Sequence, residues 1–169
     1  GLARASFKDI DRAWEAVQHA KSPRIHTFIA TSPLHMKYKL KKTEEEVLEA
    51  IQKTVSHARN LCDNIEWSCE DGGRSELEFL YQCIELAINS GASTINIPDT
   101  VGYTLPEEFG KIFKNVKNNV PNIDKAILST HTHNDLGLAT ANNVAAIKEG
   151  ARQLSAQLME WVKELVIHH

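Results

Sequence analysis

Long apolar runs, paired cysteines and an excess of positive charge are all missing from this chain of 169 residues. No stretch approaches the roughly 18 consecutive apolar residues that a membrane-spanning helix needs. Its 19 Lys and Arg face 22 Asp and Glu, so no basic surplus points to nucleic acid. The three cysteines, Cys62, Cys69 and Cys83, fit neither a disulfide framework nor a CxxC metal site. We therefore expect reduced thiols, no membrane or nucleic-acid partner, and a cytoplasmic location.

Glycine motifs that cradle phosphates are missing as well. No GxGxxG follows a strand-like run, and GxxxxGK[ST] does not occur, which argues against a dinucleotide-binding sheet and a P-loop. Hydrophobic residues make up 42% of the chain, a typical share for a globular domain and too high for a disordered one. The chain is long enough to bury a core of its own.

Strand-like runs alternate with amphipathic stretches of helical period. The predicted strands cover residues 24–30, 65–69, 94–98 and 126–131. The predicted helices cover residues 8–20, 44–60, 76–90, 107–118 and 139–149. This alternation predicts βα units and a parallel sheet, either an open doubly wound sheet or a (β/α)₈ barrel.

Several helix ends carry their own signals. A hydroxyl followed three residues later by Glu predicts a capping box, and this pattern begins at Thr43, Ser75 and Thr104. Gly91 and Gly150 follow helical stretches and predict left-handed C-terminal caps.

Chemically able side chains collect where the predicted strands end. They are His26, Ser68, Glu70, Asp71, Asp99, Thr100, His131, His133, Asn134 and Asp135. In a barrel, the carboxyl ends of all strands meet on one face, where such enzymes build their active sites. The pattern therefore favours a barrel active site over the alternative that polar loops simply begin at strand ends.

The triplet His131-Thr132-His133 is the most informative part of this set. Residues two apart on a strand point to the same side, so both imidazoles can chelate one divalent ion such as Zn or Mn. A solvated pair of histidines explains the triplet equally well.

Glu70 is the best candidate for a general base, because it follows an apolar run and would lie at the rim of a partly desolvated cleft. The alternative is a surface glutamate paired with Arg74. We expect a smaller functional role for His35, which lies in a polar loop, and for the basic run 37–42, which is expected to be a solvated charged loop. Trp67 is expected to pack in the core.

Four strings carry a resemblance to a known family: 24–36 (RIHTFIATSPLHM), 68–76 (SCEDGGRSE), 96–110 (NIPDTVGYTLPEEFG) and 131–142 (HTHNDLGLATAN). In this order and spacing they resemble the 2-isopropylmalate synthase and homocitrate synthase family of metal-dependent TIM-barrel enzymes. The resemblance covers residues 1–153. It implies condensation of acetyl-CoA with 2-oxoisovalerate and water to 2-isopropylmalate and CoA, in leucine biosynthesis, by a protein that is a homodimer at full length.

The resemblance also implies roles for single residues. His131 and His133 would be ligands of a divalent metal (Mn, Mg or Zn). His26, Ser68, Glu70 and Thr100 would bind the 2-oxo acid, with Glu70 also managing protons as the catalytic residue. Sister synthases for citramalate, homocitrate or methylthioalkylmalate are the nearest alternative, and a plastid would replace the cytoplasm in a plant.

The chain departs from the family at both ends. A strand with an Arg-Asp pair, where Asp is a metal ligand, and an Asn-Gly-x-Gly-Glu-Arg loop with a further ligand have no counterpart. We therefore expect an incomplete TIM barrel over residues 1–153, with about five βα units from the end of strand 3 through helix 7. Residues 154–169 are expected to form a divergent helical tail. A catalytically inactive partial barrel, acting only in binding or dimerisation, is the remaining alternative.

Overall fold

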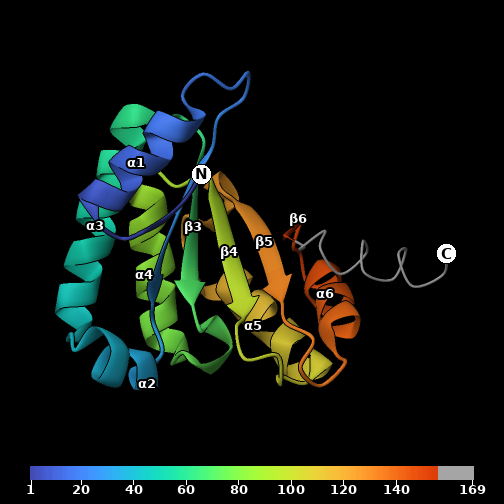
Figure 1. The fold of residues 1–169 in the computed structure, drawn as a ribbon. Helices are drawn as coiled ribbons and strands as arrows, with labels where there is room; N and C mark the ends of the chain where they lie inside the picture. Colours follow the sequence, from blue (N-terminus) through green and yellow to red (C-terminus); the bar gives the residue numbers. More distant parts are fainter. Residues whose placement is uncertain (156–169) are drawn as a thin grey trace, which may run out of the picture.

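The computed structural model describes residues 1–155, which form one parallel sheet with helices between its strands (Figure 1). The strands are β1 (Leu2–Arg4), β2 (Ile25–Ala30), β3 (Ile65–Glu70), β4 (Thr94–Asp99), β5 (Ile127–Thr132) and β6 (Gln153–Ser155). The helices are α1 (Phe7–Val17), α2 (Pro33–His35), α3 (Glu44–Leu61), α4 (Leu77–Asn89), α5 (Pro106–Asn119) and α6 (Ala139–Lys148). Among these residues, no helix is long and apolar enough to cross a membrane.

The strand order decides between the two architectures left open by the sequence. All neighbours are parallel, and the six strands follow one another as β1-β2-β3-β4-β5-β6. A doubly wound sheet would reverse its strand order at a switch point, whereas a (β/α)₈ barrel adds each strand next to the last. The structure is therefore an α/β partial barrel with five βα units and a sixth strand, as predicted.

The ends of this sheet stay unpaired within residues 1–155, because β1 and β6 each have a single strand neighbour. Strand β6 includes Leu154 and Ser155, which the sequence analysis assigned to a helical tail. The rest of that predicted tail, residues 156–169, lies outside the described residues.

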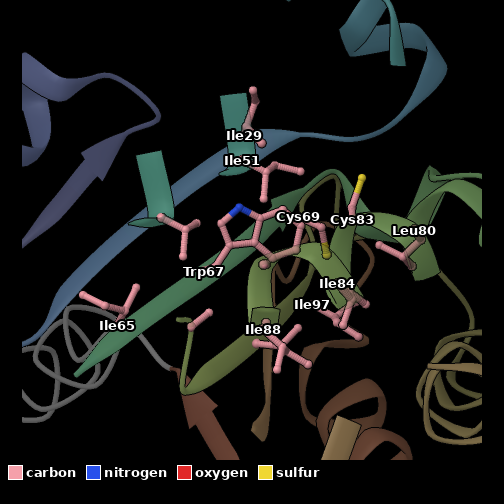
Figure 2. Packing of buried hydrophobic residues seen from close by; sticks show 14 of the residues in the cluster. Ile29, Ile51, Ile65, Trp67, Cys69, Leu80, Cys83, Ile84, Ile88 and Ile97 are labelled. Atoms are coloured by element: carbon pink, nitrogen blue, oxygen red, sulfur yellow. The ribbon is translucent and has the colours of Figure 1, made fainter. Parts of the chain in front are cut away.

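The two faces of the sheet differ in chemistry. In β3, Ile65, Trp67 and Cys69 pack against α3 and α4, and Figure 2 shows the indole of Trp67 among neighbouring aliphatic side chains. Glu66 and Ser68 alternate with them and point to the opposite side. The helix-covered face therefore holds the apolar core, and the other face is polar.

All three cysteines are free and buried in this core, as expected for reduced thiols. Burial raises the pKa of the Cys69 thiol to about 12, which keeps it protonated near neutral pH.

The predicted helix caps are partly confirmed. Thr43 and Glu46 form the full capping box of α3, and Gly91 follows α4 with a left-handed φ of 113°. Ser75 and Thr104 are not caps, because α4 and α5 begin one residue later, after Glu76 and Leu105. The Thr104 hydroxyl instead donates to the Asp99 carboxylate, so a tertiary partner has replaced the local one.

Candidate functional site

Polar side chains form a continuous row across the open face of the sheet. The strand registers place Ser68 beside Asn96, Asn96 beside Ser129, and Ser129 beside Gln153. The Ser68 hydroxyl lies 2.6 Å from His26 Nε2 and accepts a hydrogen bond of 2.9 Å from the Asn96 amide. The structure thus brings together His26 and Ser68, two of the predicted substrate-binding residues.

A buried ionic layer lies one step toward the amino ends of the strands. The Glu66 carboxylate, almost fully buried, accepts hydrogen bonds from Arg24 at 2.7 Å and from Gln153 at 3.1 Å. Arg24 also donates to the Gln153 side-chain oxygen at 2.9 Å, which ties β6 to the residue preceding β2. Sequence reasoning missed this layer, although the alternation of Glu66, Ser68 and Glu70 with apolar residues was a period-2 signal for it.

His26 sits above this layer in a setting that opposes protonation. Its imidazole is largely removed from water, which lowers its pKa below the ordinary value of 6.5. Glu66, 3.8 Å from Nδ1, acts in the opposite direction, while Arg24 and His131 add to the lowering. His26 is therefore a neutral hydrogen-bonding group near neutral pH.

The lowered pKa of His26 predicts a loss of stability in acid. Just below pH 6.5 the His26 imidazole is protonated in the unfolded chain but stays neutral in the folded chain, where its pKa is lower. The free energy of unfolding should fall as the pH drops from 6.5 toward the folded-state pKa. Urea denaturation at neutral pH and near pH 5 should show a smaller acid loss in His26→Gln than in the parent chain. An equal loss in both would contradict the assignment, and His19→Gln, at an exposed histidine after α1, is the matched control.

Glu70 ends β3 and is half-buried, with Lys39 paired to its Oε1. His35 Nδ1 lies 3.3 Å from the same oxygen. The sequence alternative that Glu70 pairs with Arg74 is wrong, because Arg74 binds the neighbouring carboxylate, Asp71. His35, expected in an unremarkable polar loop, lies in α2 and contacts the leading candidate base.

Asp71, the residue after Glu70, is held in place by hydrogen bonds at both its side chain and its backbone. It is 1% exposed, has a left-handed φ of 63°, and receives two hydrogen bonds from Arg74, at 2.8 and 2.7 Å. Its backbone N–H donates to Thr100 Oγ1 at 2.9 Å. Thr100, predicted to bind substrate, therefore joins the end of β4 to the turn that follows Glu70.

His131, in β5, and His133, one residue beyond its end, lie side by side, as expected for residues two apart in extended backbone. Their ring centroids are 5.0 Å apart, and Thr132 points away to donate to the Ala139 carbonyl. His131 Nδ1 lies 2.9 Å from the Ser155 carbonyl oxygen, which can only accept, so Nδ1 carries the proton. The lone pair of His131 is then on Nε2.

This imidazole pair fits two ligands of a divalent metal. Metal-binding histidines commonly donate their second ring N–H to a carbonyl or carboxylate, as His131 does to β6. Within residues 1–155, no group of three or more His, Cys, Asp or Glu side chains comes together in a metal-binding arrangement. Among residues 1–155 the pair could therefore provide two ligands of a metal site and not a complete one.

Three other residues of the predicted polar set, Asp99, Asn134 and Asp135, lie near the ends of β4 and β5. Asp99 is buried and accepts from Thr104 and from the Asn142 amide, so its carboxylate is occupied. Asp135 lies beside Gly102, where a Cβ would come within 2.3 Å of its Oδ2. Asn134 accepts from the Ala139 backbone N–H and starts the turn into α6.

Comparison with known proteins gives concordant results. The family model described as HMGL-like matches residues 1–159. The chain is 60% identical over 157 residues to the 2-isopropylmalate synthases of Ruminiclostridium cellulolyticum and Aquifex aeolicus. Each alignment covers 93% of this chain, and the chain spans about 30% of the length of these curated relatives. The HMG-CoA lyase structure from Brucella melitensis superposes with a TM-score of 0.73 at 21% identity, over 93% of this chain and 56% of the lyase.

Proposed function

This chain belongs to the HMGL-like family, and from that premise we propose that it carries part of the active site of a 2-isopropylmalate synthase. The proposed reaction condenses acetyl-CoA with 2-oxoisovalerate and water to give 2-isopropylmalate and CoA, the entry to leucine biosynthesis. One observation carries the proposal: relatives that are 60% identical over 93% of this chain bear that name. The HxH pair at the carboxyl end of the sheet, with His131 oriented by the Ser155 carbonyl, supports it. With its free, buried thiols, the protein is proposed to act in the cytoplasm.

In this proposal His131 and His133 hold a divalent metal, with Mn, Mg and Zn as the candidates. A bound metal supplies Lewis-acid polarisation of the keto group of the oxo acid. His26 and Ser68 contribute hydrogen-bonding groups on the same face, and their 2.6 Å contact orients them toward one another. Thr100 acts by fixing the turn at Asp71 beside Glu70.

The proposed chemistry needs a base, and Glu70 is our assignment. Glu70 takes a proton from the acetyl methyl group, and the enolate carbon bonds to the keto carbon, whose oxygen takes up a proton to become the hydroxyl. Water then cleaves the thioester, which gives a carboxylic acid and free CoA. Glu70 has Lys39 and His35 beside one of its carboxylate oxygens, Oε1, which fixes where this carboxylate lies on the site. Recognition of the oxo acid is the second role that Glu70 can serve.

Release of free CoA is the direct test. The chain is mixed with acetyl-CoA, Mn²⁺ or Mg²⁺ and one of three oxo acids: 2-oxoisovalerate, pyruvate or 2-oxoglutarate. We expect little turnover by the chain alone, because its described sheet has two unpaired ends and its described residues bring together no more than two candidate metal ligands. We expect turnover with 2-oxoisovalerate when residues 1–155 replace the matching segment of the Aquifex aeolicus relative. Preference for pyruvate or 2-oxoglutarate would favour a sister synthase, and no turnover by a folded chimera would support a binding role.

In that chimera, Glu70→Gln should reduce turnover by at least about 100-fold, the usual scale for a proton-transfer group. The change keeps the size of the side chain and removes its basicity. Glu49→Gln, on the exposed side of α3, is the matched control and should leave turnover unchanged. Near-normal turnover of Glu70→Gln would make Glu70 a structural residue.

A further inference from the structure

The environment of His35 suggests a role that the proposed reaction has not used. Its backbone is fixed by the Ser32 side chain, which caps α2 and accepts from the His35 N–H at 3.2 Å. Its Nδ1 is buried and has no aligned hydrogen-bond partner, although Glu70 Oε1 lies at 3.3 Å and Asp71 Oδ2 at 3.7 Å. A buried ring nitrogen between two carboxylates is costly unless it can engage one of them.

Arg74 determines which nitrogen of this ring carries the proton. Its Nη2 lies 3.5 Å from His35 Nε2, and a guanidinium can only donate hydrogen bonds. The guanidinium is itself held by two hydrogen bonds to buried Asp71. In the neutral ring Nε2 is therefore the acceptor, and the proton is on Nδ1, the atom nearest to Glu70.

Lys39 occupies the oxygen that His35 Nδ1 faces. It lies on the π-helical turn Met36–Leu40, which continues directly from α2, and about half of its side chain is exposed. An exposed lysine can leave a carboxylate at little cost in free energy. Once it leaves, Glu70 Oε1 is open to the His35 Nδ1–H. Catalytic hydrogen bonds are often long before substrate binds and shorten afterwards.

We propose that His35 is a positioning residue for Glu70, a donor whose proton Arg74 holds on Nδ1 and whose access to Oε1 Lys39 controls. The inference rests on the proposed function of Glu70 and adds to it. When Lys39 moves away, the His35 Nδ1–H takes its place as the donor to Oε1, so the Glu70 carboxylate keeps its orientation.

Nitrogen NMR of the ¹⁵N-histidine-labelled chain tests this without substrate or metal. Two-bond correlations from the ring carbons' protons report the protonation of each ring nitrogen even where N–H exchange is fast. We expect the Nδ1–H tautomer for His35 in the parent chain. In Lys39→Met we expect the His35 Nδ1 resonance to shift, with no shift in Lys37→Met, the neighbouring exposed lysine. The Lys39→Met shift should vanish in a Lys39→Met/Glu70→Met double variant, in which residue 70 has no oxygen to accept the Nδ1–H.

Two results would overturn the proposal: an Nε2–H tautomer in the parent chain, or a His35 Nδ1 resonance that is the same in Lys39→Met and Lys37→Met. Both lysines are exposed, so neither substitution threatens the fold. Since the readout needs no turnover, its failure differs from failure of the condensation reaction, which would appear in CoA release.

Discussion

Replacing His131 with alanine is expected to abolish divalent metal binding by this chain. His131 is the better oriented of the two imidazoles, because the Ser155 carbonyl fixes its proton on Nδ1 and leaves Nε2 to coordinate. Losing a group that only orients a ligand commonly costs 10- to 100-fold in affinity, so losing the ligand itself should cost more than about 100-fold. Calorimetric titration with Mn²⁺ or Zn²⁺ measures the change.

Two variants complete this experiment. His133→Ala should weaken binding as His131→Ala does, since the rings lie 5.0 Å apart and serve one ion in the proposed site. His57→Ala removes a histidine that is paired with Asp11 on the outer surface and should leave the affinity unchanged. An unaltered affinity in His131→Ala would remove this residue from the metal site.

Trp67→Ala should cost about 3–5 kcal/mol of unfolding free energy, the usual range for deleting a large buried aromatic side chain. Trp67 is fully buried in β3, in the core cluster that also includes Ile51 of α3 and Ile84 of α4 (Figure 2). Trp67→Ala would leave a cavity between β3 and the two helices that cover it, α3 and α4. Urea denaturation followed by circular dichroism gives the free energy directly.

Trp67→Phe is the control that keeps most of the side-chain volume. The indole N–H of Trp67 is buried without a hydrogen-bond partner, so phenylalanine removes an unsatisfied donor while keeping most of the aromatic volume. We expect a cost below about 1.5 kcal/mol. If both substitutions proved equally costly, lost shape complementarity rather than cavity volume would explain the effect.

The strands and helices were predictable because their signals are local. The four predicted strands agree with β2, β3, β4 and β5 within one residue at each end, for instance 65–69 against Ile65–Glu70. Strand β6 was not predicted, because its last two residues were assigned to a helical tail. The hydrophobic periodicity of a short segment determines which of its side chains face the helices, and this signal does not depend on the rest of the sequence. Caps were less predictable, because the hydroxyls of Ser75 and Thr104 found partners far from the helix starts that they precede.

The candidate site was predictable in its members and not in its contacts. The sequence named His26 and Ser68, and the register of β2 and β3 brought them together. It also named Glu70, but paired it with Arg74. That error has a physical cause: the left-handed turn at Asp71 directs Arg74 onto Asp71 and leaves Glu70 to Lys39. A conformation that sequence patterns rarely indicate thus decided the ion pairs.

The sequential strand order affects how the chain can fold while it is being synthesised. Every strand pairs with the one synthesised just before it, so each unit can dock as it emerges from the ribosome and none waits for a distant partner. Such short-range closure carries a small entropic cost and favours fast folding. During synthesis, the unpaired edge on the growing side of the sheet is always the strand added last. Only one newly made strand at a time is therefore exposed there to pairing with another chain.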